Sequence, residues 1–191
     1  IREHDRDIVL SIDTYYSHVA GKAVEAGADI VNDISAGAMD SNMISTVASL
    51  QVPYICMHMK GTPETMQQQA SYIDVVKEVL DFFIEKTAIC KEAGIHDIII
   101  DPGFGFGKTA GQNLQLLQSL PVFGMFEKPV LAGLSRKSTI YKTLGITASE
   151  ALNGTTVLNS IALLNGASLL RVHDVKEAKE AVLLVQAYKQ A

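Results

Sequence analysis

The chain has 191 residues, 48% of them hydrophobic and 19% charged, with a formal net charge of −5 and a mean hydropathy of +0.18. This size and composition predict a single domain, residues 1–191, around a large buried core. The negative charge and the lack of a basic cluster argue against nucleic acid as a partner. No apolar run approaches the ~20 residues of a membrane span, so we also expect no membrane partner. Cys56 and Cys90 follow no ligand spacing, which favours buried thiols and a cytoplasmic location.

Apolar runs typical of buried strands alternate with segments of helical periodicity along the whole chain. The predicted strands are Ile8–Asp13, Asp29–Ser35, Pro53–Met59, Asp97–Asp101, Pro129–Ser135 and Ser168–His173. The predicted helices are Tyr16–Ala26, Met39–Leu50, Tyr72–Ala93, Gln112–Phe126, Ser149–Asn165 and Val175–Tyr188, and a shorter one ends near Leu144. Strict βα alternation with short connections predicts a parallel α/β domain.

Three glycines stand where predicted helices end, namely Gly27, Gly94 and Gly166. A glycine at this position accepts the left-handed conformation that terminates many helices, so we expect each of them to be a C-cap.

Every predicted strand ends in polar residues, as in a barrel whose βα loops all surround one site. Six βα units are visible, whereas a (βα)8 barrel needs eight, and Ile1–His4 run almost directly into a strand. We therefore predict a (βα)8 TIM barrel in which this chain supplies units 3–8 and two units precede residue 1. A doubly wound open sheet, which needs only six strands, is the alternative.

One set of residues shares the inward face at the carboxyl ends of the strands, because side chains two apart on a strand point the same way. The set comprises Asp13, Asn32, Met57, Asp101, Gly133, Ser135, Arg171 and His173. Each alone has a structural explanation, such as a helix cap or a core residue. Their recurrence at successive strands predicts a common polar site.

Two stretches carry further chemistry. Asp101–Lys108 places an acid before a glycine-rich turn in which Phe104 and Phe106 alternate with the glycines, so a ligand can approach the backbone closely. Gly133–Ser138 places two cations and a hydroxyl before a helix, which favours an anion site. Arg171 leaves an apolar strand, and a buried arginine needs an anion, either a nearby aspartate or a ligand phosphate.

Together these segments resemble the dihydropteroate synthase family of pterin-binding barrels, in order and with plausible spacing, over essentially the whole chain. The matching pieces are Ser11–Thr14, Ile30–Ile34, Met57–Pro63, Asp101–Lys108, Ser135–Ser138 and Arg171–Asp174. The resemblance implies a (βα)8 barrel and a transferase of folate biosynthesis. That reaction joins 6-hydroxymethyl-7,8-dihydropterin pyrophosphate to p-aminobenzoate and releases pyrophosphate, and sulfonamides target it.

The resemblance also implies a role for each matching residue. Pterin contacts fall on Asp13, Asn32, Met57, Asp101, Phe106, Gly133 and Lys137. Arg136 and Ser138 would lie around p-aminobenzoate, and Arg171 with His173 would hold pyrophosphate. The implied catalytic residues are Asp13, Lys137, Arg171 and His173.

The chemistry of these side chains agrees with that assignment. A carboxylate such as Asp101 accepts two parallel N–H donors from a pterin ring, and Asn32 offers mixed donor and acceptor groups. We expect pyrophosphate to leave before the amine attacks, because the anionic Asp13 would favour a pterin-stabilised methylene cation. Arg171 and His173 would stabilise the leaving group.

The resemblance further implies Mg²⁺ as cofactor and a homodimer. The family's metal-binding Asn lies on a loop that would precede residue 1, so this sequence assigns no metal ligand. Two alternatives stay open. One is the pterin-binding domain of a methyltetrahydrofolate:corrinoid methyltransferase, which needs no cation pair for pyrophosphate. The other is a catalytically incomplete fragment that serves only anion binding or assembly.

Overall fold

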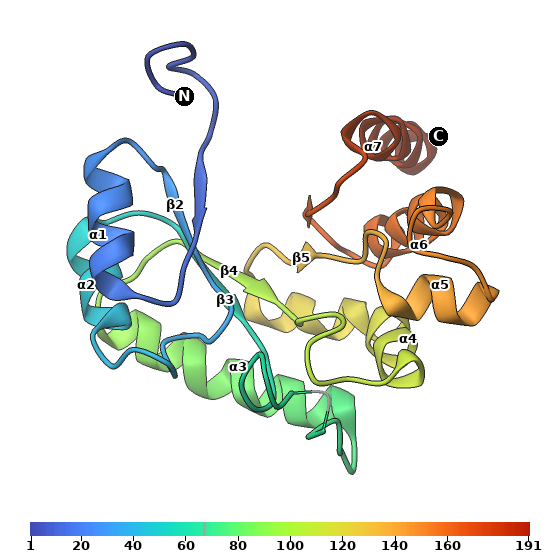
Figure 1. Cartoon of the computed structure of the whole chain (residues 1–191), viewed down its shortest axis with the longest axis horizontal. Helices are drawn as coiled ribbons and strands as arrows, with labels where there is room; N and C mark the ends of the chain where they lie inside the picture. Colours follow the sequence, from blue (N-terminus) through green and yellow to red (C-terminus); the bar gives the residue numbers. More distant parts are fainter. Residues whose placement is uncertain (67) are drawn as a thin grey trace. The chain divides into compact units, whose positions relative to one another are not determined.

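The computed structural model describes residues 1–66 and 68–191. Contacts within the chain divide it into two compact units. Unit 1 comprises Ile1–His58 and Asp81–Ile100, and unit 2 comprises Met59–Leu80 and Asp101–Ala191. In both units short parallel strands alternate with helices, as the sequence predicts (Figure 1).

Unit 1 is built on a parallel sheet with the strand order β1-β2-β3-β4. Its elements are β1 (Ser11–Asp13), α1 (Ser17–Glu25), β2 (Ile30–Asp33), α2 (Met43–Leu50), β3 (Tyr54–Met57), most of α3 (Val75–Glu92) and β4 (Ile98–Asp101) up to Ile100. The last residue of β4, Asp101, belongs to unit 2. The register pairs Asp13 with Asn32 and Asn32 with Ile55. The polar residues that close β1 and β2 therefore stand side by side.

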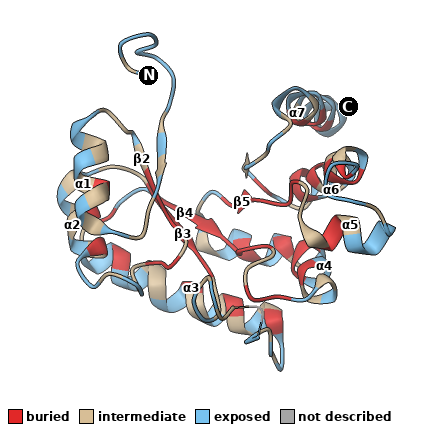
Figure 2. Cartoon of the chain, viewed as in Figure 1, coloured by how far each residue is buried: buried red, intermediate tan, exposed pale blue. Residues whose placement is uncertain are grey.

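The core of unit 1 lies on these strands. Val31, Tyr54 and Ile100 are fully buried, and Figure 2 shows β2, β3 and β4 as almost continuously buried. The helices α1 and α2 lie beside each other and each mixes buried with exposed positions (Figure 2). Strands buried on both faces explain why apolar runs rather than alternation mark them in the sequence.

Unit 2 contains the remaining elements. They are α4 (Ala110–Gln118), the 3-10 helix η1 (Leu120–Phe126), β5 (Leu131–Ala132), α5 (Ser138–Leu144), α6 (Leu152–Leu164), β6 (Leu169–Leu170) and α7 (Val175–Gln190). β5 pairs with β6 in parallel. α4 begins at a capping box, in which the Thr109 side chain accepts from Gln112 N and the Gln112 side chain accepts from Thr109 N. This cap fixes where the glycine-rich turn ends.

Three predicted elements, one helix and two strands, had the wrong extent. Gln112–Phe126 is not one helix, because Pro121 lacks an N–H group and the chain changes from α4 to η1 at that point. Pro129–Ser135 and Ser168–His173 each contain only two strand residues. The residues that follow β5 and β6 leave the ladder and form loops that carry polar side chains.

The three predicted glycine C-caps are confirmed. Gly27, Gly94 and Gly166 have φ angles of +101°, +95° and +101°. Across the described residues, no helix is both long and apolar enough to cross a membrane.

Candidate functional site

In unit 1, Asp13 and Asn32 meet at the ends of β1 and β2. The Nδ2 group of Asn32 donates to Oδ1 of Asp13 at 2.7 Å. Asn32 is only 6% exposed, and its Oδ1 atom has no hydrogen-bond partner among the described residues. Buried polar atoms in folded proteins are nearly always paired, so this acceptor is suited to a donor from outside the protein.

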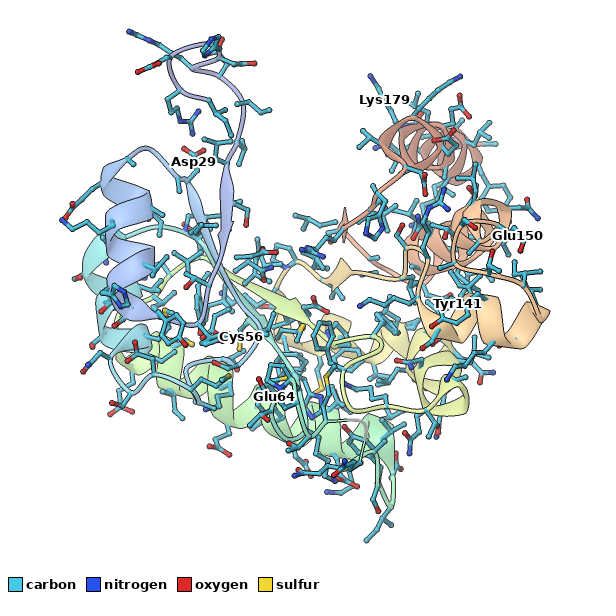
Figure 3. All side chains as sticks on the ribbon, viewed as in Figure 1. Asp29, Cys56, Glu64, Tyr141, Glu150 and Lys179 are labelled. Carbon is cyan, nitrogen blue, oxygen red and sulfur yellow. The ribbon has the colours of Figure 1, made fainter. Side chains whose placement is uncertain are left out.

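Met57 closes the next strand, β3, and is 3% exposed. Cys56, labelled in Figure 3, precedes it on the strand. The thioether is a soft apolar group at the strand end, suited to contact a flat ring. The structure thus brings three predicted residues to the same end of one sheet.

Asp33 is a residue of unit 1 that the sequence analysis did not select. Its carboxylate is fully buried and accepts from Ser35 N, Ser35 Oγ, Gly37 N and Tyr54 OH at 2.7–2.8 Å. Burial, and then the charge of Asp33, raise the pKa of Tyr54 far above its usual value. These contacts hold the turn after β2 and thereby the backbone that carries Asn32. The Asp-x-Ser spacing, typical of an Asx turn, was the available signal.

In unit 2, Asp101 is a buried carboxylate at the end of β4, and its Oδ1 accepts from Gly103 N at 2.8 Å. Burial raises its pKa, while the positive charges of Lys137, Lys108 and Arg171 act in the opposite direction. The charges of three described cationic side chains therefore act on one buried acid.

Lys137 lies over the glycine-rich turn. Its Nζ atom donates to the Phe104 carbonyl and stands 4.8 Å from the centroid of the Phe106 ring. Burial lowers its pKa to about 8 against the opposing charge of Asp101. A Cβ atom added to Gly133 would lie 3.7 Å from this Nζ. Phe106, Gly133 and Lys137, predicted as pterin contacts, thus lie together.

Lys108 is a second residue that sequence reasoning left out of the site. It is 4% exposed, and its Nζ donates to the carbonyls of Gly103 and Phe106 at 2.9 and 3.0 Å. Burial lowers its pKa to about 7. Its only sequence signal was a lysine closing a glycine-rich turn.

Ser135 and His173 connect the loops after β5 and β6. Ser135 Oγ lies 2.9 Å from His173 Nδ1 and accepts from His173 N at 3.2 Å. Arg171 and His173 are exposed, so the expectation of a buried arginine was wrong. The physical reason is that β6 ends at Leu170, which leaves Arg171 beyond the strand. Its charge still acts on Asp101 and Lys137.

Arg136 binds other residues of the chain rather than pointing to open solvent, and its ion pair with Asp174 is called the clasp below. Its guanidinium donates twice to the Asp174 carboxylate at 2.8 Å and also to the carbonyls of Ala148 and Ser149. Those carbonyls belong to the connection before α6, where Figure 3 labels Glu150. Ser138, the other residue predicted near p-aminobenzoate, is half-buried at the start of α5.

The described residues contain no group of three or more His, Cys, Asp or Glu side chains that could hold a metal ion.

A model of the pterin binding enzyme family matches residues 1–173. The dihydropteroate synthase of Escherichia coli K12 is 41% identical over 183 residues, which cover 95% of this chain and 64% of that relative. This chain thus spans about two thirds of that relative's length.

Solved structures agree. A Yersinia pestis dihydropteroate synthase in a sulfonamide drug complex matches 100% of this chain and 70% of its own, with a TM-score of 0.96 and 36% identity. The Thermus thermophilus enzyme, solved with 6HMPPP and with 4-aminobenzoate, matches 94% of this chain at a TM-score of 0.90 and 37% identity. These matches confirm the predicted fold class, an α/β barrel. The numbering of its units as 3–8 stays a prediction.

Proposed function

This chain belongs to the pterin binding enzyme family, and on that premise we propose that it supplies most of the catalytic domain of a dihydropteroate synthase. The reaction joins 6-hydroxymethyl-7,8-dihydropterin pyrophosphate to p-aminobenzoate and releases pyrophosphate. The observation that carries this proposal is the buried, unpaired Oδ1 of Asn32 beside Asp13. It supports a ligand with N–H donors, and a pterin edge presents such donors.

We propose the pterin contacts of each unit by itself. In unit 1, Asn32 Oδ1 accepts a ring N–H, and Met57 contacts the ring face. In unit 2, the Asp101 carboxylate accepts two parallel N–H donors of the aminopyrimidinone edge. Lys137 donates to the ring carbonyl, and Phe106 and Gly133 line the site. The support is that Asn32, Asp101 and Lys137 each have a contact within their own unit that holds the side chain.

The reaction then follows from where charge develops. The anionic Asp13 favours a methylene cation on the pterin, and Arg171 with His173 stabilises the departing pyrophosphate. The exposure of both residues supports this role, because a released anion needs a path to solvent. Ser135 Oγ, 2.9 Å from His173 Nδ1, orients the imidazole ring.

We place p-aminobenzoate beside Ser138. Arg136, predicted to lie near the same substrate, acts in this proposal by holding the segment, since its guanidinium is engaged by Asp174, Ala148 and Ser149. We expect sulfonamides to compete for the same place, and the Yersinia pestis relative was solved in a sulfonamide drug complex.

Mg²⁺ dependence, a homodimer and a cytoplasmic location stay predictions. No step above passes through the metal, because the described residues do not form a metal cluster. The two cysteines are free thiols, which is compatible with a reducing location.

The central test is pterin binding measured by calorimetry on this chain with 6-hydroxymethyl-7,8-dihydropterin. Asp101→Asn should weaken binding by about 100-fold, because one of two acceptors in the pair becomes a donor. Asp97→Asn is the matched control, since Asp97 precedes the opposite end of the same strand, β4. Equal affinity of the two variants would refute the assignment of Asp101.

Ligand combinations separate the alternatives. Pyrophosphate and a sulfonamide should raise the melting temperature jointly if the chain is a synthase. Stabilisation by methyltetrahydrofolate without that joint effect would instead favour the corrinoid methyltransferase reading. Pterin binding with no pteroate formed from both substrates and Mg²⁺ would indicate the incomplete fragment.

A further inference from the structure

The turn between β4 and α4 directs its carbonyl oxygens at two lysines. Gly103, Gly105 and Gly107 all have positive φ angles, +69°, +83° and +62°. This backbone, accessible to glycine, alternates with two phenylalanines whose carbonyls serve as acceptors. Lys108 Nζ donates to the carbonyls of Gly103 and Phe106, and Lys137 Nζ donates to the carbonyl of Phe104.

The two lysines differ in burial and therefore in whether their ammonium groups can reach a ligand. Lys137 is half-buried and lies beside the Phe106 ring, so its ammonium can exchange the Phe104 carbonyl for a ligand. Lys108 is almost completely buried and immediately follows the turn that it binds. Its ammonium is therefore part of the turn's internal structure.

A third side chain completes this arrangement. Asn113, 1% exposed on α4, accepts from Gly105 N at 2.8 Å and donates to the carbonyl of Thr109 at 2.8 Å. Asn113 fixes the middle of the turn to the helix, and Lys108 closes its two ends. The turn that carries Phe104 and Phe106 is thus held from inside.

Burying an ammonium group is unfavourable unless its donors and its charge are matched. Lys108 has two carbonyl acceptors, and the negative charge of Asp101 raises its pKa against the effect of burial. Reciprocally, the charge of Lys108 lowers the pKa of Asp101. An apolar residue would fill the same space without the cost of burying a charge, so the amine has a role beyond packing.

We propose that Lys108 is a positioning residue for pterin binding, whose ammonium group closes the Gly103–Phe106 turn and keeps Asp101 ionised. This inference rests on the proposed function, because it takes Asp101 as the acceptor of the pterin's N–H donors. Lys108 itself touches the turn and not the ligand.

The test compares three variants of this chain. Lys108→Met removes both the charge and the donors, and Lys108→Gln keeps an uncharged donor. Lys189→Met is the matched control, because Lys189 Nζ also donates to a backbone carbonyl, that of Leu163 at 2.7 Å, but on α7. The measurements are amide hydrogen exchange in residues 103–107 and affinity for 6-hydroxymethyl-7,8-dihydropterin from pH 4 to 7. This window lies below the pKa of about 7 to which burial lowers Lys108, so its ammonium group is present.

We expect Lys108→Met to bind pterin at least 10-fold more weakly and its turn amides to exchange at least 10-fold faster. The acid limb, the low-pH range in which pterin affinity falls, reports protonation of Asp101, on which the charges of Lys108, Lys137 and Arg171 act. It should move to higher pH in both Lys108 variants, because a neighbouring positive charge is lost. Lys189→Met should change none of these readings. A purely structural role would not move the acid limb.

Each outcome decides the proposal. Wild-type affinity in Lys108→Met, or an unshifted acid limb in Lys108→Gln, would overturn it. Unfolding of both Lys108 variants would also overturn it, in favour of a role in the fold as a whole. If the unsubstituted chain binds no pterin, the proposed function fails, and turn exchange alone then decides whether Lys108 positions the turn.

Discussion

At the scale of single residues, Asp33 combines a fully buried carboxylate with four donors from three residues. Removing a buried charged acceptor leaves its donors unpaired, which destabilises more than the net value of the bonds. Because Asp33 follows Asn32 directly, this effect also concerns the candidate site.

We predict that Asp33→Ala lowers the free energy of unfolding by about 3–5 kcal/mol, since Ser35, Gly37 and Tyr54 lose their acceptor. Tyr54→Phe, which removes one donor to a charged group, should lower it by about 1.5–3 kcal/mol. Urea unfolding followed by circular dichroism measures both. The exposed Asp97→Ala is the control, and an equal effect of Asp97→Ala and Asp33→Ala would contradict the prediction.

Sequence reasoning at this scale succeeded where a residue's position on a strand decides its neighbours. Asp13 and Asn32 close adjacent parallel strands, so their contact follows from register. It did not find Lys108 and Asp33, because their partners are turn carbonyls and donors that only the folded backbone brings within reach.

At the scale of elements, α5 and α6 pack closely at Gly154. A Cβ atom there would lie 2.5 Å from Ile140 Cγ2 and 3.1 Å from Leu144 Cδ1. The helix backbone at Gly154 needs no left-handed conformation, so space alone explains the glycine.

Gly154→Ala should therefore lower the free energy of unfolding by about 1–3 kcal/mol, despite the better helix propensity of alanine, because Ile140 must move. Gly111→Ala on α4 is the matched control, since a Cβ there meets nothing within 4 Å. That control should raise stability by up to about 1 kcal/mol. Chemical denaturation measures the free energy of unfolding of both variants, which should change in opposite directions. A Gly154→Ala variant more stable than the unsubstituted chain would contradict the close packing.

The clasp between Arg136 and Asp174 links the loop after β5 to the N-cap of α7. The guanidinium of Arg136 lowers the pKa of Asp174 below its ordinary value of 3.8. A carboxylate with a depressed pKa contributes stability above its unfolded pKa and loses that contribution as pH falls through the folded one.

We accordingly expect Arg136→Ala and Asp174→Ala each to lower the melting temperature at pH 7. The melting temperature of the double variant should be no lower than that of the less stable single variant. The difference between Asp174→Ala and the unsubstituted chain should disappear as the pH falls through the folded pKa of Asp174, which lies below 3.8. Scanning calorimetry of the four proteins forms a double-variant cycle. Additive effects would mean that the two side chains act independently.

At the scale of the whole molecule, buried titratable groups set how stability depends on pH. The pKa of Lys108 and that of Lys137 fall to about 7 and about 8 from 10.5. Over that interval the unfolded chain holds protons that the folded chain has released, so stability rises with pH. Burial raises the pKa of Tyr54 above 10.0, and a hydrogen bond with Cys90, followed by burial, raises the pKa of Cys56 above 9.0, so these two groups act in the opposite direction.

The free energy of unfolding should therefore increase from pH 7 to about pH 9, by at most ~1.4 kcal/mol per pH unit for each lysine. It should decrease above about pH 10, where Tyr54 and Cys56 of the unfolded chain lose protons that the folded chain keeps. Urea titrations at half-unit pH intervals measure this profile. Lys108→Gln should flatten the rise, and a flat profile in the unsubstituted chain would refute the assignment of two buried amines.

The sequence by itself determined the α/β class, the alternation of six strands with helices, the glycine C-caps and the strand-end residues, because these depend on local periodicity and side-chain direction. Its resemblance to a family supplied the activity that we propose. Only the tertiary structure decided which partner each polar group takes: Arg136 binds Asp174, Lys108 binds the glycine turn, and Asn32 keeps an unpaired oxygen. Such pairing depends on where distant segments come to lie, and a linear pattern of residue types does not contain that information.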